Sequence, residues 1–453
     1  MKINIVYKFI LNKIILPLGD RIFNTNYRKK INEWQYYDNL NIDTLNKIQR
    51  ERLFQILIHA RETVPFYKKK IPKKFNEDQA YSVLKKIPIL TKDLLSEKNE
   101  ELLSNRYIKS DLIKNHSSGS TGKQSFSYSL KKEIFNIQAI QRHWFFWTGY
   151  EDGDHAIQFG ISPKRGFIKK LKDYFFNIHY YSAFSLSEKD FSNIYKKLKA
   201  KKIKYIIGYP SAINELSKYM INYGLQHSVK AIISLGDKLF DHYKSNFDKS
   251  FCRPNILDTY GCAEGFMIAA KYDLDYYYIS SPHIFVEIVN DQGKYVDDGE
   301  IGHVLVTGLT NYTQPFFRYK LGDMAIKLPA SYYPNKRKFN YPLLQKIVGR
   351  ETEVIETPDN KKLIIHSFTG IFEHFPEIKQ FKIIQNDIDS LIIRYICENV
   401  NEKKILNTIQ RRIEEITNKT MKIKFEKVEE IKSYHSGKPQ LIEVRNFNKK
   451  TIS

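Results

Sequence analysis

The clearest chemical signal in this sequence is a run of hydroxyl, glycine and lysine side chains. It reads Ser117-Ser118-Gly119-Ser120-Thr121-Gly122-Lys123. Small side chains let backbone N–H groups approach phosphate oxygens, while the hydroxyls and the lysine add donors and charge. The Walker phosphate loop is excluded, because it needs glycine at position 117 and Ser or Thr at position 124. The run is therefore either a plain turn or a phosphate loop of another kind of enzyme.

The composition fits a folded protein of two or three structural units. The chain has 453 residues, of which 42% are hydrophobic and 27% charged, which is globular composition. The net charge of +23 favours nucleotides, coenzyme A, anionic lipid or nucleic acid as neighbours. Scattered lysine is more often solvated surface. Because no helix-turn-helix, zinc finger or RNA-binding aromatic signature occurs, we expect no nucleic-acid partner.

Three cysteines occur in the sequence: Cys252, Cys262 and Cys397. None stands in a C-x-x-C pair or at zinc-ligand spacing, so we expect neither a disulfide framework nor a zinc site. Small buried apolar residues are the simplest interpretation, and they suit a reducing cytoplasm.

The N-terminal segment, residues 1–18, is apolar, but Lys8 and Lys13 interrupt it and no small-residue cleavage site follows. Such a segment is too broken to span a bilayer. It predicts an amphipathic helix that packs on the protein, with attachment to an anionic inner membrane surface through residues 1–20 as the alternative.

The pattern of apolar segments predicts an α/β fold with two domains. We expect a large N-terminal domain, residues 1–348, and a small mobile α+β C-terminal domain, residues 349–453. Within the large domain, residues 1–110 are mainly helical by periodicity and 283–348 are β-rich with Asp/Gly turns. Residues 111–282 alternate short apolar strands with polar helices, which is typical of βαβ units and a largely parallel sheet.

Four further segments follow the phosphate-type loop in a fixed order. They are Asp258-Thr259-Tyr260-Gly261-Cys262-Ala263-Glu264, Arg318-Tyr319-Lys320-Leu321-Gly322-Asp323, Gly349-Arg350 and Ser436-Gly437-Lys438. The five segments, in this order and near these spacings, resemble the adenylate-forming enzymes: acyl-CoA synthetases, luciferases and peptide-synthetase adenylation domains. The resemblance covers nearly the whole chain.

Within that superfamily the sequence looks like the phenylacetate-CoA ligase group and its CapK-like branch, linked to capsular polysaccharide. Residues 58–67, 87–92 and 208–211 carry this narrower resemblance, and they have no chemistry of their own. It implies a role in capsule or surface polysaccharide biosynthesis.

The resemblance implies an ATP- and Mg²⁺-dependent ligase that converts a small carboxylate into an acyl-AMP. Transfer of the acyl group to the thiol of coenzyme A, or to a sugar-linked amine or hydroxyl, would follow. Two alternatives stay open: nucleotidyl transfer like that of coenzyme F390 synthetase, and a basic membrane-binding protein without catalysis.

The resemblance also implies a role for each site residue, and each role has a physical reason. Residues 117–123 would hold the pyrophosphate end of ATP, and the Glu264 carboxylate would suit Mg²⁺. Tyr260 would stack on adenine, and Asp323 would accept both ribose hydroxyls. The other implied nucleotide and pocket residues are Gly236, Asp237, Gly261 and Arg350.

Lys438 is the implied catalytic residue, because a cation that bridges the carboxylate and the α-phosphate stabilises charge that develops in the transition state. The implied hinge follows Gly349-Arg350 as Glu351-Thr352-Glu353. The family pattern has two acidic residues there, so Thr352 replaces the first of them. This departure puts efficient rotation toward thioester formation in doubt, and with it coenzyme A as acceptor.

Overall fold

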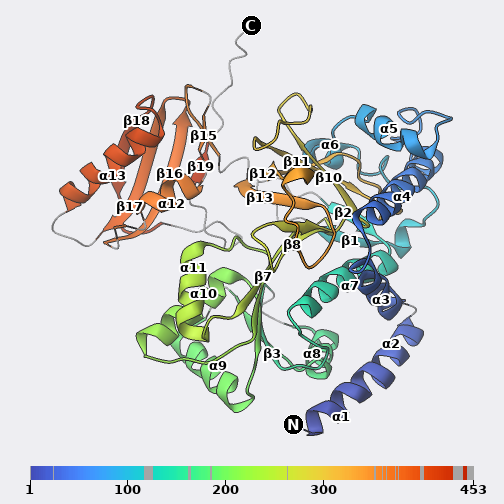
Figure 1. The fold of residues 1–453 in the computed structure, drawn as a ribbon, viewed down its shortest axis with the longest axis horizontal. Helices are drawn as coiled ribbons and strands as arrows, with labels where there is room; N and C mark the ends of the chain where they lie inside the picture. Colours follow the sequence, from blue (N-terminus) through green and yellow to red (C-terminus); the bar gives the residue numbers. More distant parts are fainter. Residues whose placement is uncertain are drawn as a thin grey trace. The chain divides into compact units, whose positions relative to one another are not determined.

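The computed structural model describes most of the chain in ranges that short gaps separate (Figure 1). The described residues are 2–23, 25–116, 126–161, 165–183, 186–262, 264–350, 354–359, 361–363, 365–372, 374–375, 377–397, 402–431 and 442–445. They fall into two compact units. Unit 1 comprises Met1–Val286, Val306–Tyr319 and Pro329–Leu344. Unit 2 comprises Glu287–Leu305, Lys320–Leu328 and Gln345–Ser453.

Unit 1 begins with helices. They are α1 (Lys2–Ile10), the π-helical η1 (Leu11–Ile15), α2 (Leu16–Phe23), α3 (Tyr27–Tyr37), α4 (Ile42–Thr63), η2 (Glu77–Gln79), α5 (Ala80–Lys86), α6 (Lys92–Glu97) and η3 (Lys109–Asp111). The Asn41 side chain caps α4 by accepting a hydrogen bond from the Thr44 N–H at 2.8 Å. The helix ends where Pro65 restricts Val64 to an extended conformation, with φ −111°.

A hairpin then precedes the main sheet. Strands β1 (Ile113–His116) and β2 (Phe126–Ser129) pair antiparallel, with His116 opposite Phe126. Residues 117–125 connect the two strands, so the predicted phosphate loop lies outside the described residues.

The main sheet of unit 1 places the ends of its parallel strands along one edge. Its strands are β3 (Ala156–Gly160), β4 (Ile178–Ser182), β5 (Tyr205–Gly208), β6 (Ala231–Ser234), β7 (Asn255–Cys262), β8 (Phe266–Lys271) and β9 (Tyr277–Ile279). The strand order is β4-β3-β5-β6-β7-β8-β9, and β4 to β7 run parallel. The first residues of β3, β5, β6 and β7 are aligned partners. The carboxyl ends of these strands therefore meet at one edge, where parallel sheets bind ligands.

Helices connect the parallel strands, as the alternating pattern predicted. They are α8 (Phe167–Phe175), α9 (Glu188–Ala200), α10 (Pro210–Asn222) and α11 (Asp241–Phe251), with α7 (Lys131–Trp147) before β3. Pro210 occupies the first turn of α10, where its missing N–H costs nothing. In α7 the aromatic residues Trp144, Phe145 and Trp147 are buried, so this cluster belongs to the core around the helix. A short turn, η4 (Ala330–Tyr332), also belongs to unit 1.

Four strands each have residues in both units. They are β10 (Ile284–Val289), β11 (Ile301–Gly308), β12 (Tyr319–Lys327) and β13 (Leu343–Arg350). Within unit 2 they neighbour one another in that order. The β-rich character predicted for this segment is therefore observed.

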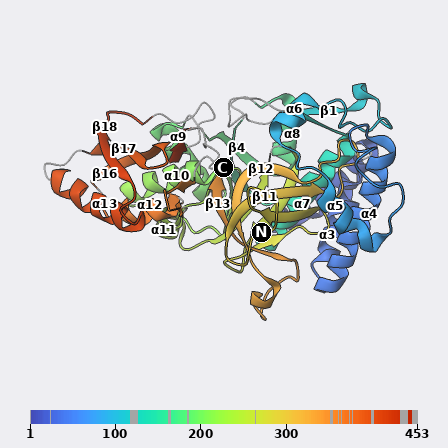
Figure 2. The same ribbon diagram turned by 90° about the horizontal axis from the view of Figure 1, so that it is seen from above.

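The C-terminal part of unit 2 is an α+β fold. It contains β14 (Ile355–Glu356), β15 (Lys362–Leu363), α12 (Ile365–Phe372), β16 (Ile378–Asp387), β17 (Ser390–Cys397), α13 (Glu402–Ile416), β18 (Lys422–Lys427) and β19 (Ile442–Val444). The sheet order is β18-β17-β16-β19. Helices α12 and α13 lie on one face of this sheet (Figures 1 and 2), and Ile409 and Ile413 of α13 are fully buried. The predicted α/β fold class is confirmed.

Gly208, at the carboxyl end of β5, offers a stability test of this strand edge. Its φ is +135°, and an added Cβ would lie 2.1 Å from the Phe159 carbonyl oxygen. We predict that Gly208→Ala lowers the free energy of unfolding by about 3 kcal/mol or more, because backbone strain adds to a clash with main chain. Chemical denaturation would measure the change.

Gly224→Ala is the matched control, because Gly224 has a φ of +62° and nothing within 4 Å of an added Cβ. We expect it to cost only the conformational strain, about 1 kcal/mol. Equal losses in the two variants would contradict the close approach of β5 to β3.

Candidate active site

The carboxyl end of β6 is joined to the middle of β7 by hydrogen bonds of polar side chains. Asp258 accepts hydrogen bonds from the Ser234 hydroxyl at 3.0 Å and from the Tyr277 hydroxyl. The Thr259 hydroxyl donates to the Ser234 carbonyl at 2.7 Å. Burial raises the pKa of Asp258, while the two hydroxyl donors oppose that shift. This network positions the segments that follow β6 and β7.

Gly236 and Asp237 follow β6 directly. Gly236 has a φ of +74°, and an added Cβ would lie 2.9 Å from the Tyr209 ring, so only glycine fits beneath that ring. Burial, together with the nearby Asp237 carboxylate, raises the pKa of Tyr209 to about 12. One Asp237 oxygen accepts from the Lys238 N–H at 2.8 Å, and the other is buried without a hydrogen-bond partner among the described residues.

Tyr260 and Gly261 lie near the end of β7, where the pairing with β8 shifts register between them. Such a bulge redirects side chains and is frequent beside active sites. The Tyr260 side chain is buried. Its predicted stacking on adenine remains a prediction.

Glu264 follows the same strand end, and it is buried with 7% of its surface exposed. The hydroxyl of Tyr319, which is fully buried, donates a hydrogen bond to Glu264 Oε1 at 2.9 Å. A buried carboxylate needs such a donor, because it has lost water as a partner. Glu264 also contributes to a raised pKa of the Cys262 thiol, of which burial is the larger cause.

Asp323 and Arg350 lie on neighbouring strands of unit 2. Arg350 Nε and Asp323 Oδ1 form an ion pair at 3.0 Å, with 37% and 13% of the respective side chains exposed. The two residues assigned to ribose and phosphate are therefore brought together, although they are 27 positions apart in the sequence.

Several predicted residues lie outside the described residues. They are Ser117 to Lys123 of the loop, Glu351 and Thr352 of the hinge, and the catalytic candidate Lys438. Their assigned roles remain predictions.

Sequence reasoning missed the side chains that hold the predicted residues in place. Tyr319 stands inside a segment that was singled out, yet no role was assigned to it. Ser234, Tyr277 and Tyr209 were also missed. Their partners lie on other strands, so no local spacing reveals them. Hydroxyl residues at the ends of predicted strands are the one signal that could have found Ser234 and Tyr209.

The Mg²⁺ that the resemblance implies would need carboxylate ligands at this site. Among the described residues, no three His, Cys, Asp or Glu side chains form a cluster that could hold a metal ion. Mg²⁺ in nucleotide sites commonly takes only one or two carboxylates, with phosphates and waters as its other ligands. A single buried carboxylate oriented by Tyr319 fits that mode of binding.

Comparisons with known proteins find relatives by sequence and by fold. The sequence model of the CapK C-terminal domain family matches residues 355–445. Over its full length the chain is similar to Protein CapK of Staphylococcus aureus, with 22% identity over 464 residues that cover 96% of this chain and 98% of CapK.

Solved structures show the same fold. 2-Hydroxyisobutyryl-CoA ligase, in the postadenylation state in complex with R3-HIB-AMP, superposes with a TM-score of 0.70 at 15% identity over 90% of this chain and 91% of the ligase. A fatty acyl-adenylate ligase, from a study of the E. coli and L. pneumophila enzymes, gives a TM-score of 0.52 at 15% identity over 72% of this chain and 67% of that protein.

The fold is therefore that of the adenylate-forming enzymes, as the sequence predicted. The matches to CapK and to its C-terminal domain confirm the narrower resemblance to the CapK-like branch. In the part of the chain that the structure describes, no helix is both long enough and apolar enough to cross a membrane.

The proximity of Glu264 to Cys262 can be tested by thiol chemistry. Negative charge raises a thiol pKa, so Glu264→Gln should lower the pKa of Cys262, increase its thiolate fraction at pH 8 and speed its alkylation. Peptide mass spectrometry after timed iodoacetamide treatment would measure the rate. Cys252, which is exposed, serves as the internal control. An unchanged Cys262 rate would contradict the assigned contact.

Proposed function

We propose that this chain is a ligase that uses ATP to adenylate a carboxylic acid and then passes the acyl group to an acceptor. The observation that carries the proposal is the buried Glu264 carboxylate, oriented by the Tyr319 hydroxyl at the carboxyl end of β7. It stands where the five-segment resemblance expects a nucleotide-site acid, in a fold shared with acyl-adenylate ligases.

In the proposed reaction, a carboxylate oxygen of the substrate attacks the α-phosphorus of ATP. An O–P bond forms as the bond from the α-phosphorus to the oxygen bridging the β-phosphate breaks, and pyrophosphate leaves. The protein supplies position and charge for this step. Mg²⁺, when bound, neutralises phosphate charge.

Described residues contribute to this reaction in distinct ways. Glu264 would hold Mg²⁺ through a carboxylate whose orientation Tyr319 fixes. Asp323, held by Arg350, would accept the ribose hydroxyls. Residues 236–237 and 260–261 would border the adenosine and acyl groups at the sheet edge. Lys438 would meet the α-phosphate and the attacking carboxylate, as the resemblance implies.

The acyl acceptor belongs to one of two chemical classes. A thiol such as coenzyme A, or a sugar-linked amine or hydroxyl, would take the acyl group from the acyl-AMP. Thr352 in the hinge is the reason to test both classes. A role in surface polysaccharide synthesis remains a prediction.

A pyrophosphate-exchange assay with a library of carboxylic acids tests the first half-reaction. We expect one class of acids to drive exchange, and Lys438→Ala and Glu264→Gln to reduce it by about 100-fold or more while folding is retained. Glutamine at 264 still offers an oxygen to the Tyr319 hydroxyl. Lys422→Ala is the control, because the Lys422 side chain is 83% exposed on β18.

Two outcomes would count against the proposal. Exchange that ignores carboxylic acids would favour nucleotidyl transfer to another acceptor. Exchange that survives both Lys438→Ala and Glu264→Gln would remove the assigned site.

We also propose that the N-terminal helices lie on an anionic membrane surface. Helices α1 and η1 contact the rest of unit 1: the Tyr7 hydroxyl donates to the Phe175 carbonyl at 2.7 Å, Lys8 pairs with Asp154 at 2.5 Å, and Leu11 of η1 is fully buried. Other apolar side chains of α1, η1 and α2 face solvent. They are Val6, Phe9, Ile10, Ile14, Leu18, Ile22 and Phe23, each 39 to 64% exposed.

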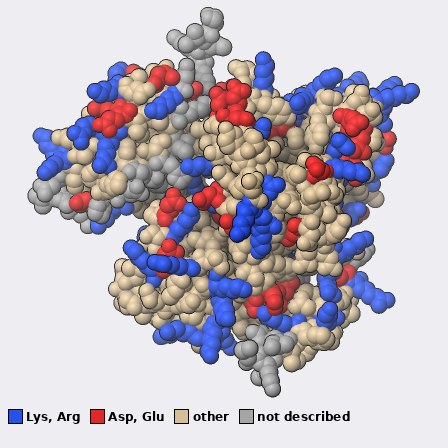
Figure 3. Space-filling view, in the orientation of Figure 1, with Lys and Arg blue, Asp and Glu red and all other residues tan. Residues whose placement is uncertain are grey.

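This arrangement suits a lipid partner. An exposed apolar stripe on an amphipathic helix marks an interaction site, and Lys13 and Arg21 are exposed on the same helices. Elsewhere the basic charge is dispersed: Lys and Arg side chains are spread among Asp and Glu over the face drawn in Figure 3. Insertion of these N-terminal apolar side chains into lipid would therefore supply membrane affinity that scattered lysines do not supply.

Vesicle sedimentation tests this contact. The triple variant Phe9→Ser, Ile14→Ser, Leu18→Ser should lose binding to phosphatidylserine-containing vesicles, because it removes side chains that would insert into lipid. Ile108→Ser, at a position 70% exposed on η3's N-terminal side, should bind as the unmodified chain does. Equal sedimentation of the triple variant and the control would contradict the proposal.

A further inference from the structure

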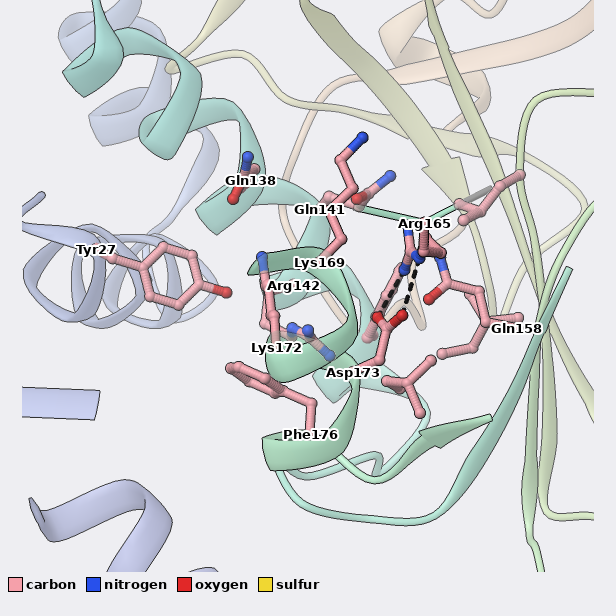
Figure 4. A pocket seen from close by; sticks show the side chains of 14 residues that line it. Tyr27, Gln138, Gln141, Arg142, Gln158, Arg165, Lys169, Lys172, Asp173 and Phe176 are labelled. Atoms are coloured by element: carbon pink, nitrogen blue, oxygen red, sulfur yellow. Dashed lines mark hydrogen bonds and ion pairs between the residues drawn. The ribbon is translucent and has the colours of Figure 1, made fainter. Parts of the chain in front are cut away.

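A cavity of about 270 Å³ opens in unit 1 between α7, α8 and the main sheet (Figure 4). Its lining is mixed, because eight of the lining residues are charged or carry an amide and six are aromatic or aliphatic. The lining residues are Tyr27, Gln138, Gln141, Arg142, Phe145, Gln158, Arg165, Lys169, Lys172, Asp173, Phe176, Ile178, Ile207 and Leu235. Four of them are cationic, and Asp173 is the single carboxylate among them.

The Asp173 carboxylate already forms an ion pair. Arg165 contacts Asp173 through two nitrogens, with Nε to Oδ2 at 2.8 Å and Nη2 to Oδ1 at 2.6 Å. This bidentate geometry is the strongest that an arginine and a carboxylate adopt. Asp173 is therefore paired mainly with Arg165, and it also attracts the Lys172 ammonium group more weakly.

Arg142 is held in place from behind the cavity. Its Nε lies 3.3 Å from Asp152 Oδ1, and 12% and 4% of the two side chains are exposed. The guanidinium carbon lies 5.0 to 5.4 Å from the ring centres of Phe145, Tyr150 and Phe176. Its Nη1 is buried and has no hydrogen-bond partner among the described residues. Arg142 therefore contributes a permanent positive charge, held by an ion pair and three aromatic rings, to the wall of the cavity.

Lys172 adds a further cation to the lining. No Asp or Glu lies within ion-pair distance of its ammonium group in the described ranges. Burial lowers the pKa of Lys172, and the nearby Arg142 lowers it further, while Asp152 and Asp173 oppose that shift. An anion bound beside Lys172 would offset the cost of burial and the repulsion from Arg142.

The three glutamines of the lining have free amides. Gln138 and Gln141 lie one turn apart on α7, and Gln158 lies on β3. All three are half-buried, and none makes a side-chain hydrogen bond to another described residue. Amides that offer both donors and acceptors suit ligand hydroxyl groups.

The cavity adjoins the candidate active site. Leu235 lines it, and Gly236 and Asp237 are the next two residues of the chain. Gln158 and Ile207 line it from β3 and β5, two residues and one residue before those strands end. A molecule in the cavity would therefore extend from the strand edge at which acyl activation is proposed.

We propose that this cavity binds the acyl part of the substrate and selects carboxylic acids that carry a second anionic group, a carboxylate or a phosphate, on a hydroxylated chain. This inference rests on the proposed adenylation. The carboxylate to be activated would face residues 236–237, and the second anion would face Arg142, Lys169 and Lys172.

The alternative of a plain fatty or aromatic acid is disfavoured by desolvation. An apolar tail would remove water from three amides and the cationic groups without replacing their hydrogen bonds. Each such loss costs about 1 to 3 kcal/mol, and more for charged groups. The apolar members of the lining, such as Phe176 and Ile178, form only part of its wall.

Calorimetric binding of matched acids tests the inference directly. Pentanoate is compared with glutarate, and glycerate with 3-phosphoglycerate, at constant ionic strength. The unmodified chain should prefer the doubly anionic member of at least one pair by about tenfold or more. The pair that shows the preference identifies the second group as carboxylate or phosphate.

Variants of the lining supply the control. Lys172→Gln should abolish most of that preference, because it removes a cation that forms no ion pair with a described carboxylate. Lys170→Gln, on the same helix but outside the lining, should leave it unchanged. No preference in either pair, or an equal effect of the two variants, would overturn the inference.

The exchange assay separates this inference from the proposed function. Doubly anionic acids that bind with the expected Lys172 dependence but drive no exchange would contradict adenylation and support the selectivity of the cavity. Exchange driven equally by both members of each pair would support adenylation and contradict the selectivity.

Discussion

Parallel pairing of β3 to β7 is the constraint on which the rest of unit 1 depends. Because the amino ends of these strands are in register, their carboxyl ends share one edge. The Asp258 carboxylate on β7 then accepts hydrogen bonds from Ser234 on β6 and from Tyr277 on β9, and so links three strands of the sheet. Gly236 follows β6, Tyr260 lies near the end of β7 and Glu264 follows it, so adjacent strands deliver all three to the same side of the sheet.

The sequence was sufficient to predict the α/β class, the helical start, the alternating segment and the resemblance to adenylate-forming enzymes. These predictions rested on local signals, such as Pro65 after α4 and Pro210 at the start of α10, or on short ordered motifs. The bond from Tyr319 to Glu264 could not be predicted, because it joins positions 55 residues apart through the packing of separate strands. The boundary at 348–349 and the roles of Lys438 and residues 117–123 remain predictions.

The cavity lined by Arg142 and Lys172 could not be predicted from the sequence either. Arg142 stands directly before a run of buried residues in α7, and Lys172 stands in a lysine-rich helix, where both look like ordinary surface charges. Only the approach of α8 to α7 and β3 places them around one space. A charge without a partner is a property of three-dimensional packing, so no one-dimensional pattern records it.

Helix α8 contributes to two regions at once. Its Phe175 carbonyl receives the hydrogen bond from α1, while Lys169, Lys172 and Asp173 line the cavity. Any displacement of this nine-residue helix by an event at α1 would therefore alter affinity at the cavity. By thermodynamic reciprocity, occupancy of the cavity would alter the energy of that event by the same amount.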